Sequence, residues 1–205
     1  MLKIISEPIG TGRERACYVH PEDPRLAIKM PMGEVSDQTE RDLKFYRKLK
    51  KRGIKGIPHV PDFHGLCDTN LGRGIVVDLI RNYDGEISRP LNWHLAQGVP
   101  IEEFDPFLDE LKQSFLDNLI IFNHDMTIGN ILFQKSSTGT AQLVAIDGLG
   151  DVVAIDWLDR FPWLVRHKIN RRWKRFMARA HRTPEVRQQR DEMMDSGSSV
   201  PSKQQ

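Results

Sequence analysis

The stretch 122–134, FNHDMTIGNILFQ, joins an apolar helical pattern to a short apolar run through a polar loop. Within this loop, Asp125 is followed five residues later by Asn130. Three interpretations are open: a catalytic loop that handles a phosphate and a metal ion, a cluster of metal ligands, or a helix-to-strand turn with polar filling. The sequence on either side has to distinguish among them.

The composition limits the class of protein. The chain has 205 residues, 39% of them hydrophobic, which is enough to bury a core in one domain or in two small lobes. Its net charge is only +2, so a charged partner has to be inferred from local patches of charge. The two cysteines, Cys17 and Cys67, lack a disulfide-framework or CxxC spacing. With neither a signal-like start nor an apolar run of about 18 residues, the expected location is the cytoplasm.

The first half of the chain predicts strands and turns with one helix among them. Short β-branched or apolar runs favour strands at 3–9, 16–19, 26–30 and 74–80. A helix is predicted over 37–51, because apolar side chains recur there near helical spacing and glycines follow.

The second half begins with an expected linker at 81–86 and continues with helices. An apolar stripe over 105–121 predicts a helix, with Asp105 as its cap and Pro106 at its first position. The remaining predictions are a hairpin formed by 131–134 and 142–146, one or two basic helices over 157–182, and a polar tail from 183 onward.

Phosphoryl transfer needs a cradle for phosphates, a cation to pair with them, oxygen ligands for a metal ion and a group that orients the acceptor. Gly10 and Gly12 fall between two predicted strands, where glycine lets backbone N–H groups approach an anion. Lys29 follows two apolar residues at the end of a predicted strand, in AIK. The kinase lysine that pairs with the α- and β-phosphates lies in the same kind of sequence, V-A-I-K. Taken alone, the glycines also fit a plain hairpin turn, and the lysine a solvated strand end.

A lysine in this role needs an acidic partner on the following helix. Glu40 and Asp42 both lie early in the predicted helix, but residues two apart face different ways, so only one can point inward. Glu40 has the longer reach. Asp42 has the better spacing to Tyr46 and Leu49. Both stay candidates, and two solvated surface acids are the alternative.

The quoted loop and the segment after the hairpin complete the set. The spacing of Asp125 and Asn130 is that of H-R-D-x-x-x-x-N, in which the aspartate orients the acceptor and the asparagine holds a metal ion. Asp147, in AIDG, follows an apolar strand and is the candidate for the second metal ligand. Isolated D-x4-N pairs are common, but one placed between AIK and AIDG is much less so. These residues together favour a site for ATP and Mg²⁺.

The other two interpretations of the loop fit less well. His124 has no second histidine or cysteine at ligand spacing, so it is expected to pack under the loop or to hydrogen-bond its backbone. A nucleophilic hydrolase is disfavoured, because the chain has no G-x-S-x-G and neither cysteine has an obvious base partner.

These pieces resemble the protein-kinase-like superfamily and, more closely, the bacterial YrbL family associated with the PhoP regulatory network. The resemblance covers most of residues 1–180 and rests on IGTG (9–12), YVHPED (18–23), AIK (27–29), RDLKFYRKL (41–49), GIVVDLI (74–80) and GNIL (129–132). It implies an α+β, compact two-lobed protein-kinase-like fold: an N-lobe antiparallel sheet with one helix, and a mainly helical C-lobe with a short catalytic hairpin. ATP would lie between the lobes, and backbone groups of a hinge from Asp78 to Ile80 would contact adenine.

The chain also departs from the kinase pattern. Asp147 is followed by Gly-Leu-Gly in place of Phe-Gly, Asn123 stands where kinases have histidine, and no A-P-E segment follows. The short C-terminal part resembles compact kinases that phosphorylate a small-molecule or glycolipid hydroxyl rather than a protein. Because some YrbL-family members have degenerate catalytic positions, the alternative is a catalytically weak or inactive regulatory binding module.

Basic residues gather near the C-terminus. From 160 to 182 there are nine lysines and arginines, no acid, and several aromatic residues. Such a segment suits an anionic membrane surface or glycolipid, contacted by Arg171, Arg172 and Arg175, with a peripheral location at the inner membrane surface. A solvated helix covering the lower lobe explains the same pattern. No nucleic-acid motif accompanies these charges, so nucleic acid is not an expected partner.

The predicted organisation is therefore an N-lobe over 1–80, a C-lobe over 81–182 and a flexible polar tail over 183–205.

Overall fold

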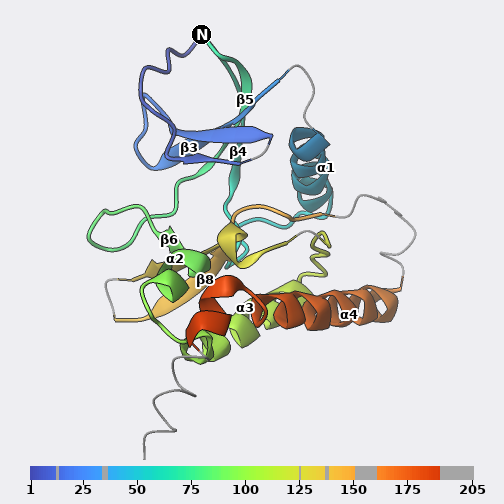
Figure 1. Ribbon diagram of the computed structural model, residues 1–205. Coiled ribbons are helices and arrows are strands. Elements are labelled where there is room, and N and C mark those ends of the chain that lie inside the picture. The colour runs from blue at the N-terminus through green and yellow to red at the C-terminus, as the bar shows by residue number, and fades with distance from the viewer. Residues whose placement is uncertain (13, 34–36, 125, 137–138, 151–160, 190–205) are drawn as a thin grey trace, which may run out of the picture.

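The computed structural model describes residues 1–12, 14–33, 37–124, 126–136, 139–150 and 161–189. Figure 1 shows the chain in two parts, a sheet with one helix beside it and, below them, a mainly helical part with a small sheet. This arrangement confirms the predicted α+β, two-lobed fold.

The N-lobe is built on a five-stranded antiparallel sheet with the strand order β1-β2-β3-β5-β4. Its strands are β1 Gly10–Thr11, β2 Arg15–Val19, β3 Leu26–Pro31, β4 Phe63–Thr69 and β5 Gly72–Asp78. Alternate side chains of β3 face opposite sides of the sheet. Ala27 belongs to the large core shared with the C-lobe, whereas Ile28 and Met30 pack with Ile4 on the outer face. Lys29 therefore points inward, toward the C-lobe.

The helix α1, Asp37–Lys51, lies beside this sheet. Its buried residues are Asp42, Phe45, Tyr46 and Leu49, which is the i, i+3, i+4, i+7 stripe of a half-buried helix. The Tyr46 ring stacks on Phe63 of β4 at 5.0 Å between centroids. Asp42 is the single charged member of the buried stripe, so the helix carries one carboxylate into the space beneath the sheet.

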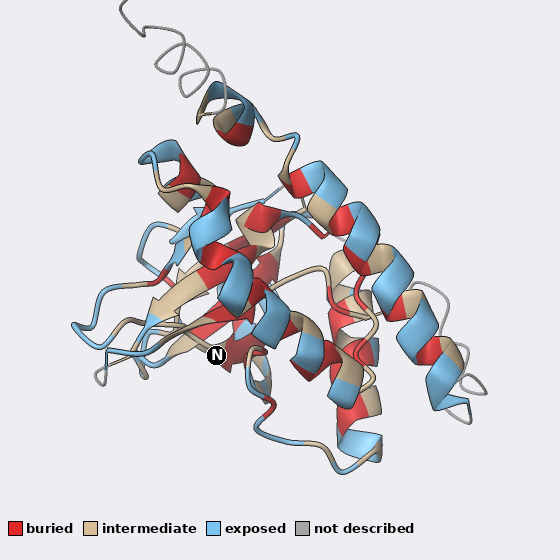
Figure 2. Cartoon of the chain, turned by 90° about the horizontal axis from the view of Figure 1, so that it is seen from below, coloured by how far each residue is buried: buried red, intermediate tan, exposed pale blue. Residues whose placement is uncertain are grey.

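The C-lobe has helices around a three-stranded sheet of order β6-β7-β8. Its elements are β6 Arg89–Pro90, α2 Leu91–Ala96, the 3-10 turns Ile101–Phe104 and Ile128–Asn130, α3 Asp105–Asp117, β7 Ile131–Lys135, β8 Ala141–Ala145 and α4 Pro162–Ala180. The helices α3 and α4 contact each other, and each has buried residues along one side and exposed residues along the other (Figure 2). Phe115, Phe122 and Trp173 form one aromatic cluster there.

Several sequence-based expectations about elements are wrong. Residues 3–9 form no strand: only Leu2 bridges Thr69, and Ile5 is 86% exposed. The helix predicted over 105–121 ends at Asp117, because Leu119 adopts a positive φ of 52°. Asp105 is the first helical residue and not a side-chain cap, since the 3-10 turn ending at Phe104 leads directly into α3.

The predicted flexible tail is also too long at its start. Val186 is buried, and the side-chain amide of Gln189 donates to the carbonyls of Leu95 and Val99. Residues 183–189 are thus packed against the C-lobe. The rest of the predicted tail, 190–205, lies outside the described residues.

Candidate functional site

Three chain segments bring charged groups together between the lobes. Lys29 of β3 donates to Asp42 of α1, with Nζ and Oδ2 3.3 Å apart, and also to the carbonyl of Ile146. Both charged side chains are at most 10% exposed. A buried lysine requires such partners, since an unpaired buried charge is strongly unfavourable. The predicted lysine therefore has an acidic partner on the next helix.

That partner is Asp42 and not Glu40. Glu40 lies on the solvent side of α1, two-thirds exposed, and its carboxylate is 3.7 Å from Lys44, one turn along the helix. The longer reach of Glu40 is irrelevant because the helix points it away from Lys29. Glu40, proposed from sequence as a cofactor-site residue, is thus placed outside the cluster.

Asp147 follows β8 and faces the same cluster. Its Oδ1 accepts from the Gly148 N–H at 2.7 Å. Burial alone raises the pKa of this carboxyl, but the positive charges of Lys29 and Arg15 and the hydrogen bonds from Arg15 and Gly148 outweigh burial and lower it. Asp147 is therefore an anion at neutral pH, as a metal ligand must be.

The loop that contains the quoted stretch is joined to the segment after Asp147. The Asn123 N–H donates to the Gly148 carbonyl at 2.6 Å, and Phe122 bridges Leu149. Gly148 has a φ of 75°, and a Cβ there would lie 3.4 Å from Met126 Cα. Glycine permits both this backbone conformation and the close approach of the two loops.

Asn130 and Asp147 line one cleft of about 660 Å³. Its other lining residues come from α1 (Gln38, Arg41, Asp42), the loop (Asn123, His124, Thr127), the segment after Asp147 (Gly148, Leu149) and α4 (Arg179). Asp125, the predicted acceptor-orienting residue, lies outside the described residues. The cleft thus brings together two predicted metal ligands and the partner of Lys29.

The donors in this cleft fit Mg²⁺ held together with a nucleotide. Carboxylate and amide oxygens are hard ligands, and Mg²⁺ in nucleotide sites takes one or two carboxylates, with phosphates and waters completing its octahedron. Asp147 and Asn130 would supply the protein's share. Within the described ranges, no group of three or more His, Cys, Asp or Glu side chains could hold a metal by itself.

Arg15 is a member of the cluster that the sequence-based reasoning missed. Its guanidinium donates to Asp42 at 2.7 Å and to Asp147 at 2.6 Å, and its Nε donates to Gln38. Burial lowers the pKa of Arg15, but the two carboxylates outweigh burial and raise it, so the side chain stays charged. The sequence held one signal: in the pattern G-x-G-x-x-G that begins at Gly10, the third glycine is replaced by Arg15.

The two glycines of the predicted phosphate cradle and the predicted adenine hinge do not line that cleft. Gly10 forms β1 with Thr11, rather than a turn, and Gly12 closes a tight turn by donating to the Arg15 carbonyl at 2.8 Å. Asp78 and Ile80 line a different cavity of about 370 Å³. The Ile80 carbonyl accepts from Ser88, and the Asp78 carboxylate binds His64 at 2.7 Å. Adenine contacts by this hinge stay a prediction.

The structure shows where His124 and the basic residues of α4 lie. His124, expected to pack under the loop or to hydrogen-bond its backbone, is exposed and lines the cleft, so the packing alternative is wrong and the backbone alternative stays a prediction. The buried Asn123 supports the loop by accepting from the His124 N–H. Arg172 donates to the Phe122 carbonyl and so links α4 to the start of the loop. Arg171 and Arg175 are exposed on α4. Arg179, on the same helix, lines the cleft and donates to the Met126 carbonyl.

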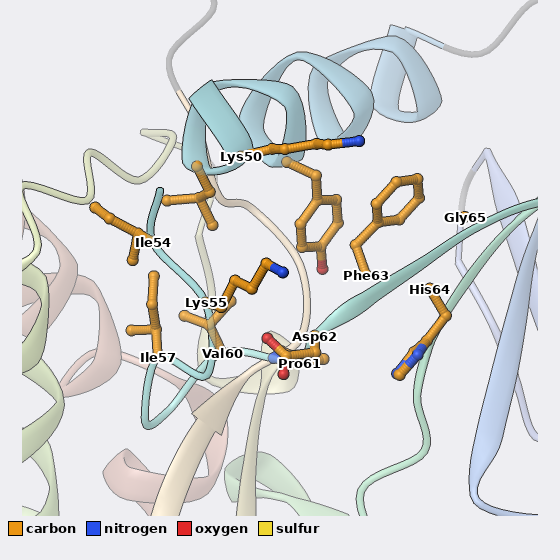
Figure 3. A pocket seen from close by; sticks show the side chains of 12 residues that line it. Lys50, Ile54, Lys55, Ile57, Val60, Pro61, Asp62, Phe63, His64 and Gly65 are labelled. Carbon is orange, nitrogen blue, oxygen red and sulfur yellow. The ribbon is translucent and has the colours of Figure 1, made fainter. Parts of the chain in front are cut away.

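A third cavity, of about 430 Å³, lies between α1 and β4 (Figure 3). Ile54, Ile57, Val60 and Phe63 give it an apolar lining, with Lys50 and Lys55 among its polar residues. It contains none of the predicted site residues. An apolar lining therefore does not mark the candidate site; the charged cluster does.

None of the helices in the described ranges is long and apolar enough to cross a bilayer.

Two solved structures are similar in part to the chain, both of the PknI kinase domain of Mycobacterium tuberculosis. One, a double mutant of that domain, has a TM-score of 0.46 at 15% identity over 69% of this chain, and the other has 0.45 at 15% over the same share. The chain spans little more than half of each of those domains, 56% and 57%.

Curated relatives are more similar in sequence. The uncharacterized protein YrbL of Escherichia coli K12 is 34% identical over 177 residues, which cover 83% of each chain, and the protein of that name from Shigella flexneri matches equally. Residues 5–181 match the family described as PhoP regulatory network protein YrbL. The chain belongs to this YrbL family.

Proposed function

We propose that this chain is an ATP- and Mg²⁺-dependent phosphotransferase of kinase-like type that acts on a hydroxyl of a small molecule or glycolipid. The observation that carries the proposal is one charged cluster, in which Lys29 pairs with Asp42 and Arg15 links Asp42 to the partly buried Asp147, beside the cleft that Asn130 lines. In this proposal Lys29 pairs with phosphates, Asn130 and Asp147 hold Mg²⁺, and Asp125 orients the acceptor hydroxyl. Mg²⁺, when bound, would neutralise charge that develops on the phosphates.

The charge of the cleft supports an anionic acceptor. Arg41 of α1 and Arg179 of α4 both line it, and Arg41 forms no ion pair with a described acidic residue. Guanidinium groups bind phosphate and carboxylate in a bidentate way. Phosphorylated or acidic sugars, free or in a glycolipid, are the acceptors that this chemistry would recognise.

The proposal is tested by phosphate transfer from labelled ATP with Mg²⁺ to a panel of neutral sugars, sugar phosphates and anionic glycolipid vesicles, with products identified by mass spectrometry. We expect Asp147→Asn to reduce transfer on the order of a hundredfold, as for the loss of one electrostatic group at a transition state. Asp68→Asn, which removes an exposed carboxylate in the N-lobe, is the matched control. Transfer that is equally fast in wild type and Asp147→Asn would contradict the proposal.

The second candidate is a kinase-like regulatory module that binds nucleotide without turnover. It is favoured by the pairing of Arg15 with Asp147, which engages the predicted metal ligand within the protein. The two candidates differ in a simple measurement. Both require ATP to raise the melting temperature of the protein, since a ligand that binds only the folded state stabilises it. Only the first requires phosphate transfer.

Cys17 offers a direct readout of nucleotide binding in either case. It lies opposite Lys29 in the β2–β3 pairing and packs on the inner core, whereas Cys67 packs on the outer face of the same sheet. At ATP concentrations about ten times Kd, we expect alkylation of Cys17 to slow about tenfold while that of Cys67 is unchanged. Because burial raises the pKa of both thiols, the reaction is run at about pH 9 and read by peptide mass spectrometry. Equal protection of both cysteines would contradict binding beneath the sheet.

A further inference from the structure

The position of Arg15 has a consequence for metal binding. Its guanidinium lies between Asp42 of α1 and Asp147 after β8, at 2.7 and 2.6 Å, and the side chain is 6% exposed. With Gln38 accepting from Nε at 3.1 Å, all three guanidinium nitrogens have an acceptor. Arg15 is thus held by three hydrogen bonds to residues from two other segments.

The cluster is electrically balanced in this state. Arg15 and Lys29 supply two positive charges, and Asp42 and Asp147 supply two negative charges. Both oxygens of Asp147 are engaged, Oδ1 by the Gly148 N–H and Oδ2 by Arg15. A carboxylate keeps further lone pairs, but a guanidinium at 2.6 Å repels any divalent cation that approaches them. Asp147 therefore cannot serve a metal ion well while Arg15 holds it.

The base of Arg15 is fixed to the glycine turn. The Gly12 N–H donates to the Arg15 carbonyl at 2.8 Å, so the side chain begins where the predicted phosphate cradle ends. A guanidinium that swings from Asp147 toward this turn would meet the phosphates of a bound nucleotide, for which its planar fork is well suited.

We propose that Arg15 and a divalent cation are alternative partners of Asp147. When a nucleotide binds, its phosphates pair with Arg15 in place of Asp147, so that Asp147 is released to the metal ion that arrives with the nucleotide. This rests on the proposed nucleotide-binding function and adds a residue and an order of binding to it. In this view free metal binds weakly to the empty protein, and Arg15 becomes a phosphate ligand in the filled site.

The test measures Mn²⁺ binding to the full chain without nucleotide, by the electron paramagnetic resonance signal of free Mn²⁺. We expect Arg15→Gln to bind Mn²⁺ at least about tenfold more tightly than wild type, and Asp147→Asn to abolish that gain. Arg73→Gln, which removes an exposed guanidinium paired with Asp68, is the charge-matched control and should leave Mn²⁺ affinity unchanged. If Arg15→Gln does not fold, Arg15→Met, which keeps the apolar length of the side chain, replaces it. An unchanged Mn²⁺ affinity in the folded variant overturns the proposal.

A second arm separates this proposal from the proposed function. In EDTA, without metal, Arg15→Gln should bind ATP about tenfold more weakly than wild type, because a guanidinium–phosphate pair is lost. An equal ATP affinity overturns the role of Arg15 as a phosphate ligand. If wild type binds ATP with Mg²⁺ but Arg15→Gln binds Mn²⁺ no more tightly than wild type, the proposed exchange of Arg15 for a metal ion at Asp147 is wrong and nucleotide binding stands. If Arg15→Gln gains Mn²⁺ affinity and no nucleotide binds wild type, the competition at Asp147 stands and the proposed function is wrong.

Discussion

Replacing Asp42 with alanine is expected to lower the free energy of unfolding by about 3 kcal/mol, the scale on which removing one partner of a buried ion pair destabilises a protein. Asp42 accepts from both Arg15 and Lys29, and its side chain is 6% exposed. Without it, two buried cations share the single carboxylate of Asp147. The cost comes from leaving charge buried without a partner rather than from the lost attraction itself.

Glu40→Ala is the matched control for this prediction. It removes the same charge from the same helix, but Glu40 is exposed and its partner Lys44 is equally solvated, so the change should stay within about 0.5 kcal/mol. Both variants are compared by urea unfolding at equilibrium. ATP should still raise the melting temperature of Glu40→Ala and fail to do so for Asp42→Ala. Equal losses of stability would show that α1 does not present Asp42 to Lys29.

The choice between Asp42 and Glu40 shows how much of the candidate site can be predicted from the sequence. The helix over 37–51 is predicted correctly, because its apolar residues repeat at helical spacing. The phase of that repeat includes Asp42 with Phe45, Tyr46 and Leu49 and leaves Glu40 on the opposite side. A local pattern therefore contains the answer. The alignment of Lys29 with Asp147 depends on how two lobes meet, which no local pattern encodes.

Other features were beyond the sequence for identifiable reasons. The strand β4, FHGLCDT, alternates between exposed and half-buried residues and contains glycine and aspartate, which are uncommon in strands. It is stabilised by its pairing with β5, a contact that only the tertiary fold supplies. Arg15 looked like one more basic residue beside a glycine turn. Its role follows from two carboxylates that lie 27 and 132 residues further along the chain.

A larger effect on stability is expected in the C-lobe, where Phe115→Ala should cost about 3 to 5 kcal/mol. The Phe115 side chain is fully buried, and its ring lies 5.7 Å from that of Phe122 and 6.3 Å from that of Trp173. Alanine would leave a cavity between α3 and α4 that these large rings cannot fill without leaving their own contacts. Trp163→Ala, at a site 67% exposed, is the control and should change stability by less than about 0.5 kcal/mol.

This cavity would also disturb the candidate site, because Phe122 begins the loop FNHDMTIGNILFQ and bridges Leu149, two residues after Asp147. We therefore expect Phe115→Ala to weaken ATP binding even where the variant remains folded, while Phe115→Leu, which keeps most of the volume, loses less stability and less binding. Urea unfolding gives the stability, and calorimetric titration at a temperature where all variants are folded gives the affinity. If Phe115→Ala lost several kcal/mol of stability but bound ATP as wild type does, the aromatic cluster would support the fold without positioning the loop. The positions of Asn130 and Asp147 would then depend on the backbone hydrogen bonds between their two loops alone.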